Sequence, residues 1–130
     1  MKNFFPGLDT KNIFNTDYTT MKNNQVFDDF MKMDIRTGTI LKAEKVEKSN
    51  KLLKMEVDTG IDKRTIVSGI AKYFSTEEVI GKQVSVLVNL APRKIMGVTS
   101  QGMILLAEDH DGKLVFVTPE KSVENGSGIS

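Results

Sequence analysis

The sequence contains no cysteine and only one histidine, His110. Without cysteine the chain can form neither disulfides nor thiolate metal sites, and one histidine leaves a zinc ion with carboxylate ligands only. A hydrolase triad needs a histidine beside its serine, but His110 lies in an acidic turn, residues 108–112, with nothing to direct it toward Ser68 or Ser100. We therefore expect no catalytic residue and no bound metal.

Long apolar runs and nucleotide-binding loops are also absent. No segment approaches the roughly 20 apolar residues of a membrane helix, and residues 1–10 lack the apolar core of a signal peptide. With no cysteine, these features favour a cytoplasmic protein that contacts no membrane. Neither G-x-x-x-x-G-K-[ST] nor a strand-linked G-x-G-x-x-G occurs. We expect no cofactor and, by elimination, a binding module that is not an enzyme.

A strong charge excess is missing as well. The net charge is +1 at pH 7, whereas nucleic-acid-binding domains often have a pI above about 9. Any nucleic-acid site must therefore be a local patch. Between Val79 and Ala107 the chain has three cations, Lys82, Arg93 and Lys94, and no acidic residue. An anion would dock in this stretch.

The same stretch has the pattern of a strand, a loop and a second strand. Valines at alternate positions over residues 84–88 share one face, which is typical of a barrel strand with one face inward. Pro92 ends this strand because proline cannot donate to the sheet ladder. We expect an exposed loop over residues 91–101 and a buried strand over residues 103–106, with Met103 in the core.

The rest of the chain supplies three more strands and a helix. Apolar patterning predicts strands over residues 35–46, 53–58 and 64–70. A glycine inside the first of these, Gly38, indicates a bend or bulge. A short helix is expected over residues 73–80, with Ser75 or Thr76 as its N-cap. Five strands with a helix between the third and fourth predict an all-β OB-fold, a Greek-key barrel of five strands.

An OB-fold binds oligonucleotides on its second and third strands and at two of its loops. These are the loops between the first and second strands and between the fourth and fifth. In this chain they are residues 47–51 and 91–101, and both carry cations. Two strand residues, Arg36 and Arg64, could border the same groove or pair with Asp34 and Asp62.

The chain is expected to have three parts: an N-terminal arm or linker, residues 1–25, the OB-fold domain, residues 26–107, and a C-terminal β extension, residues 108–130. A helix over residues 26–33 would begin the domain. Its apolar residues Phe27, Phe30 and Met31 fall on one face and could plug an end of the barrel.

The C-terminal extension holds one further strand. Residues 113–118 are apolar on both faces and need cover, which makes this strand a candidate dimer contact. Residues 124–130 are rich in glycine and serine and are expected to fray.

Three segments carry a family resemblance: NLAPRKIMGVTSQGMILLA at 89–107, VSGIA at 67–71 and DIRTGTI at 34–40. In this order they closely resemble the tRNA-binding domain at the C-terminus of methionyl-tRNA synthetases, over about residues 27–107. Similar domains occur in the free-standing bacterial tRNA-binding protein, the endothelial monocyte-activating polypeptide and the CsaA chaperone. The resemblance implies tRNA as a partner, a homodimer, and a catalytic domain in the same chain of a parent methionine–tRNA ligase.

The predicted tRNA-binding residues are Asn89, Arg93, Lys94, Met96, Ser100, Gln101, Lys48 and Lys51. Arginine would bind a phosphate through two hydrogen bonds and lysine as a point charge. The Asn, Ser and Gln side chains could bond to ribose or phosphate, or equally to the local backbone. Met96 could contact a base or ribose, and the two lysines of the 47–51 loop could extend the patch. That loop is shorter than the commonest family pattern, which often ends in Ala-Asp-Lys-Leu.

Aromatic residues for base stacking are scarce near the groove, apart from Tyr73 and Phe74. Recognition of a folded RNA by shape and backbone is therefore expected over stacking of single-stranded bases. The favoured function is non-sequence-specific tRNA binding that raises the local tRNA concentration at a catalytic domain. The alternatives are a CsaA-like homodimeric export chaperone with an apolar peptide groove and a general nucleic-acid binder. The tail after Ala107 and the Asn-rich arm favour the synthetase appendage.

Overall fold

The computed structural model describes residues 24–130. The chain divides after Met33 into two units, and the described part of the first unit is one helix. The expected arm, residues 1–25, lies outside the described residues except for Asn24 and Gln25, which begin that helix. From residue 24 onward, no helix has the length and hydropathy of a membrane span.

The helix of the first unit is α3 (Asn24–Met31). It confirms the helix expected over residues 26–33, although it begins and ends two residues earlier. The apolar side chains Phe27, Phe30 and Met31 are exposed. Their action as a plug for the barrel stays a prediction.

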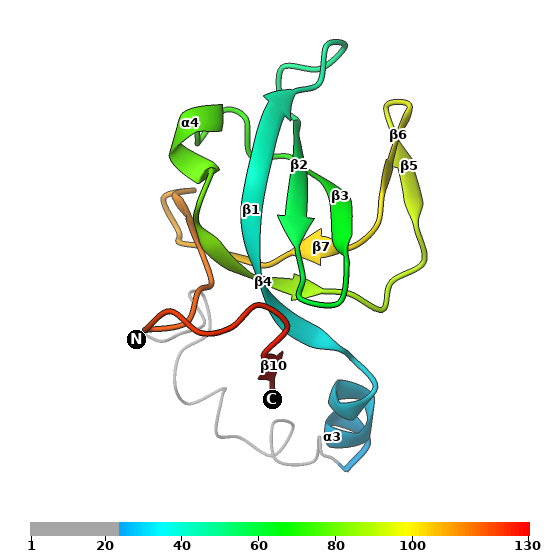
Figure 1. Cartoon of the computed structure of the whole chain (residues 1–130). Coiled ribbons are helices and arrows are strands. Elements are labelled where there is room, and N and C mark those ends of the chain that lie inside the picture. The colour runs from blue at the N-terminus through cyan, green and yellow to red at the C-terminus, as the bar shows by residue number, and fades with distance from the viewer. Residues whose placement is uncertain (1–23) are drawn as a thin grey trace. The chain divides into compact units, whose positions relative to one another are not determined.

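The second unit is built on an antiparallel sheet with strand order β3-β2-β1-β4-β7 (Figure 1). Its strands are β1 (Ile35–Lys45), β2 (Leu53–Asp58), β3 (Lys63–Ser68), β4 (Gln83–Leu87) and β7 (Met103–Ile104). β1 serves twice, because residues 35–39 pair with β4 and residues 39–45 pair with β2. With helix α4 (Thr76–Val79) between β3 and β4, this sheet forms the all-β OB-fold barrel expected from the sequence.

The sheet bends where β1 passes from one partner strand to the other. Gly38 is buried at this point, and a Cβ atom there would lie 2.8 Å from Val57 Cγ1 and 3.0 Å from the carbonyl oxygen of Asp58. The pairing with β2 then shifts register between Ile40 and Lys42. Such a bulge increases the local twist and lets one strand join both halves of a barrel. A bulge in the first strand is thus confirmed, but it lies between Ile40 and Lys42 and not at Gly38 itself.

Alternating side chains fill the barrel interior. Leu53, Met55 and Val57 of β2 are fully buried, and the residues between them are half-buried. Val84 and Val86 of β4 join the same core. β2 thus follows the period-2 pattern that the sequence predicts, whereas in β4 Ser85 on the opposite face is buried as well.

Ser75 is the N-cap of helix α4, which decides between the two expected candidates, Ser75 and Thr76. The Ser75 hydroxyl accepts a hydrogen bond from the Glu78 amide at 3.1 Å, and the Glu78 carboxylate accepts one from the Ser75 amide at 2.7 Å. This reciprocal capping box satisfies two amides that the helix would otherwise leave unpaired. Val79, on the inner face of the helix, is fully buried in the barrel core.

The C-terminal extension contains β8 (Leu106–Glu108), β9 (Leu114–Phe116) and β10 (Gly128–Ile129). The expected strand over residues 103–106 is divided between β7 and β8, and β9 is the strand expected over residues 113–118. Phe116 of β9 stacks on Phe74, with ring centroids 4.7 Å apart.

The tail after Val123 is held against β1 and β4, so the expectation that residues 124–130 fray is wrong for most of them. β10 pairs with the start of β1, and the Gly126 amide donates to the Thr37 carbonyl at 2.7 Å. The Gln83 side chain bonds to both the amide and the carbonyl of Val123, and Thr39 donates to the Asn125 side chain. These long-range bonds outweigh the flexibility of a glycine-rich segment.

Candidate nucleic-acid interface

The cationic segment expected as an irregular loop, residues 91–101, is a β-hairpin. β5 (Arg93–Ile95) pairs with β6 (Val98–Ser100), and this ribbon runs beside β3 (Figure 1). Met96 and Gly97 form the two-residue turn, with φ of +50° and +84°. Positive φ at both positions is the pattern of a type I′ turn, whose twist matches that of the flanking strands.

The register of the hairpin separates its two cations. Because successive residues of a strand point to opposite faces, Arg93 shares a face with Ile95 and with its partner Ser100, while Lys94 shares the other face with Thr99. Ser100 is buried, so the Arg93 face is the one turned toward the barrel. Arg93 and Lys94 are both exposed, and within residues 24–130 neither forms an ion pair.

The polar residues at the end of the hairpin bind the backbone of β3. The Ser100 hydroxyl accepts a hydrogen bond from the Val67 amide at 3.0 Å and donates one to the Gly102 carbonyl at 3.1 Å. The Gln101 amide donates to the Thr65 carbonyl at 2.8 Å, and the Gln101 side-chain oxygen accepts from the Thr65 amide at 3.0 Å. Both side chains are thus bonded to backbone, as one alternative expected, but their partners on β3 are 33 and 36 positions away, and only the bond from Ser100 to Gly102 is local.

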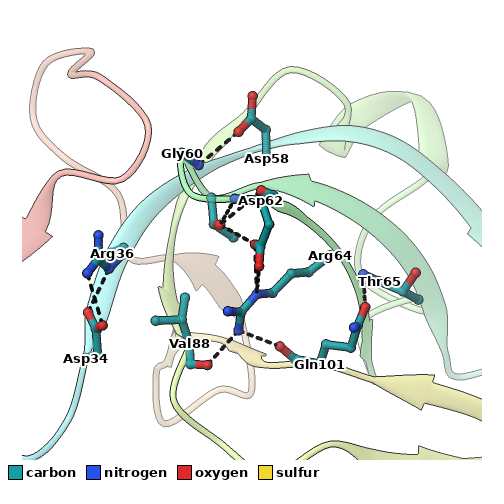
Figure 2. Close-up of polar contacts among 10 residues, drawn as sticks. Asp34, Arg36, Asp58, Gly60, Asp62, Arg64, Thr65, Val88 and Gln101 are labelled. Carbon is teal, nitrogen blue, oxygen red and sulfur yellow. Dashed lines mark hydrogen bonds and ion pairs between the residues drawn. The ribbon is translucent and has the colours of Figure 1, made fainter.

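Arg64 of β3 joins the two ends of the hairpin segment (Figure 2). One of its terminal nitrogens, Nη1, donates to the carbonyl oxygens of Val88, at 2.6 Å, and Gln101, at 3.1 Å. Its Nε donates to the Asp62 carboxylate at 2.9 Å. The pairing of Arg64 with Asp62, one of the two expected possibilities, is confirmed. The carbonyl contacts could not be predicted, because they depend on the packing of β3 against distant segments.

A second arginine–aspartate pair lies at the start of β1. Arg36 Nε donates to the Asp34 carboxylate at 2.9 Å, and this hydrogen bond raises the pKa of Arg36 above its ordinary value. The Asn89 side-chain oxygen accepts a hydrogen bond from the Asp34 amide at 2.9 Å. Asn89 is exposed, yet it also fixes the end of β4 to the segment that leads into β1.

The two expected binding loops meet at a groove. Its volume is about 280 Å³, and it is lined by both lysines and glutamates of the first hairpin, Lys48 among them, and by Met96 and Val98 of the second. Lys48 and Met96 are therefore brought together. Lys51 does not line this groove, and its carbonyl accepts a hydrogen bond from the Ala71 amide at 3.0 Å.

Comparisons with known proteins agree with this architecture. The family model of the tRNA binding domain matches residues 35–128. The chain is 64% identical to the methionine–tRNA ligase of Flavobacterium johnsoniae over 104 residues, which are 80% of this chain and 15% of the relative. It is 59% identical to that of Cytophaga hutchinsonii over 115 residues, 88% of this chain and 17% of the relative. The chain thus spans about 15% of the length of the curated relatives it matches first.

Two solved structures resemble the whole barrel. A MetRS related protein from Pyrococcus horikoshii aligns with a TM-score of 0.77 and 42% identity, over 85% of this chain and 100% of that one. The chaperone CsaA of Bacillus anthracis aligns with a TM-score of 0.74 and 30% identity, over 85% of this chain and 99% of that one. On the match of the family model and of the Pyrococcus horikoshii protein, this chain belongs to the tRNA binding domain family.

Proposed function

We propose that this domain holds tRNA through its phosphate backbone, without sequence preference, as part of a methionine–tRNA ligase. The observation that carries the proposal is the β5–β6 hairpin, which presents Arg93 and Lys94 to solvent with no ion pair to any residue from 24 to 130. Unpaired guanidinium and ammonium groups favour phosphate contacts. The groove that contains Lys48 and Met96 continues this surface.

Arg93 and Lys94 lie on opposite faces of the β5–β6 ribbon, and this determines which phosphates they would contact. Two side chains on opposite faces of a ribbon meet different phosphates and not the same one. Each contact adds affinity and fixes orientation, and neither reads a base. Ser100 and Gln101 then act mainly by holding the end of the hairpin to β3, since their hydrogen bonds join them to its backbone. Asn89 acts mainly by fixing the end of β4 to the Asp34 amide. Lys51 would act at the edge of the patch.

The role of such a module is to raise the concentration of tRNA near a catalytic domain in the same longer chain. The module itself would carry no aminoacylation chemistry, and the ligase reaction would take place in the cytoplasm. A homodimer is consistent with β9, where Val115 and the neighbouring Val117 are exposed to 48% and 44%. Apolar side chains in a row on a surface strand favour cover by a partner.

Competition tests this function against its two rivals. Labelled tRNA bound to the chain is challenged with unlabelled tRNA, with unstructured RNA of equal length, and with an unfolded peptide. We expect tRNA to compete best. Equal competition by unstructured RNA would show a general nucleic-acid binder, and displacement by the peptide alone would favour the CsaA-like chaperone.

A further inference from the structure

An apolar slot lies beside Arg93, between β3 and the start of the hairpin. Its volume is about 110 Å³. Val67, Leu90, Ile95 and Met103 supply apolar walls, and Arg93 is the one charged residue in the lining among those that the structure describes. Leu90 and Met103 are exposed to 41% and 46%, so the expectation that Met103 belongs to the core is wrong.

The slot is fixed in shape by the contacts already described. Arg64 donates hydrogen bonds to the carbonyl oxygens of Val88 and Gln101. Val88 is two residues before Leu90, and Gln101 is two residues before Met103, so these bonds fix the backbone next to two walls of the slot. Ser100, also in the lining, bonds through its hydroxyl to Val67 and Gly102. The floor of the slot therefore offers apolar contact, and the Ser100 hydroxyl already has its partners.

The size of the slot limits what it can hold. A volume of about 110 Å³ is about four times the ~30 Å³ of one water molecule, and far below the ~300 Å³ at which sites for drug-sized ligands begin. One ring system can enter it, while a nucleoside or a folded segment cannot enter whole. A thioether and aliphatic walls suit the face of a flat ring, since methionine sulfur makes favourable contacts with aromatic systems.

The positive charge of Arg93 indicates which kind of ring-containing ligand the slot would bind. Arg93 lines the slot and is exposed, and none of the described residues of the lining is acidic. A ligand that fits places an apolar ring in the slot and an anion on the guanidinium, and a nucleotide joins these two groups covalently. Building on the proposed function, we propose that the slot receives one unpaired nucleobase of the bound RNA while an adjacent phosphate binds Arg93. Base contact is then made without aromatic residues, contrary to the pure backbone recognition expected from their scarcity.

The test uses the full chain and two labelled RNA hairpins with the same duplex and a single-stranded tail of the same length. One tail carries uracil bases, and the other is abasic, so that both have the same number of phosphates. Wild type is expected to bind the uracil tail about tenfold more tightly, which corresponds to about 1.4 kcal/mol, because only that tail can place a base in the slot. Leu90→Ala/Met103→Ala should abolish this preference and leave the affinity for the abasic tail unchanged.

The control variant is Ile80→Ala, which removes an apolar side chain of similar exposure, 48%, that does not line the slot. It should keep the preference. As a second measurement, 4-thiouridine in the tail should form photo-crosslinks to residues of the slot. Equal affinity of wild type for the two tails, a preference that survives in the double variant, or crosslinks only elsewhere would overturn the slot. Salt-sensitive tRNA binding that persists in that case would leave the proposed function standing, whereas no binding of any RNA would overturn both.

Discussion

Arg64 donates a hydrogen bond from Nη1 to the carbonyl oxygen of Val88 at 2.6 Å, and this bond ties β3 to the end of β4. The same nitrogen reaches Gln101, where the chain returns from the cationic hairpin. Only 18% of the Arg64 side chain is exposed. One guanidinium thus fixes both ends of the segment that carries Arg93 and Lys94.

Replacing Arg64 by lysine should lower the free energy of unfolding by about 1–3 kcal/mol, because an ammonium cannot reproduce a fork that bonds two carbonyls and a carboxylate at once. Urea denaturation measures the change. Arg36→Lys is the matched control, since among residues 24–130 the Arg36 side chain pairs with Asp34 alone and is 32% exposed. There the loss should stay below about 1 kcal/mol. Equal losses in the two variants would contradict the role given to Arg64.

Asp62 makes stability depend on pH. Hydrogen bonds from Arg64 and Thr59 hold the pKa of Asp62 below its ordinary value. Because the folded-state pKa is the lower one, the stabilisation is complete above the ordinary Asp pKa of about 4 and is lost as pH falls through the folded-state pKa. Wild type should therefore lose more stability than Asp62→Asn between about pH 6 and pH 2.

Urea denaturation of both proteins across that range measures this difference, with Glu120→Gln as a control at an exposed carboxylate. Parallel pH profiles for wild type and Asp62→Asn would show that the Asp62 pair contributes nothing in solution.

Met96 has a left-handed backbone conformation, which glycine and asparagine adopt more readily than methionine. Its φ of +50° is in the left-handed region, which costs a non-glycine residue about 1–2 kcal/mol, and asparagine tolerates it better. Met96→Asn should therefore raise the free energy of unfolding by about 0.5–1 kcal/mol, since the side chain is 54% exposed and leaves no cavity. If Met96 contacts RNA in the groove, the same variant should bind tRNA more weakly. A lower midpoint of thermal denaturation for Met96→Asn than for wild type would show that the Met96 backbone is not strained.

Arg93→Ala and Lys94→Ala should weaken tRNA binding independently. Because the two side chains lie on opposite faces of the ribbon, their effects should add to within about 0.5 kcal/mol in the double variant. Lys82→Ala is the control, as it removes an exposed cation from the same acid-free stretch outside the hairpin. Strong non-additivity in fluorescence titrations would mean that the two cations share one phosphate.

Patterns within single segments explain what could be predicted. The alternation of Leu53, Met55 and Val57 indicates β2, and a serine three residues before Glu78 indicates the start of α4. The hairpin was missed because its strands have three residues each, and its turn places a methionine where glycine or asparagine is usual.

Features that depend on distant segments could not be read from the sequence. The tail is ordered by bonds from Thr37 and Gln83, which lie 40 or more positions away in the chain. The exposure of Met103 likewise depends on how β7 meets the hairpin. Of the predicted site residues, Ser100 is buried, whereas the other seven lie on exposed surface: Lys48, Lys51, Asn89, Arg93, Lys94, Met96 and Gln101. Nothing in the local sequence separates these two groups.

The central claim is that the hairpin cations bind tRNA phosphates, and the dependence of tRNA affinity on salt tests it most directly. The dissociation constants of wild type and Arg93→Ala/Lys94→Ala are measured at several salt concentrations. The slope of log affinity against log salt should be shallower in the double variant by about 2, because each phosphate left without its cation accounts for about 1. The affinity of the double variant at low salt should fall by about 1–3 kcal/mol. An unchanged slope and affinity would contradict the claim.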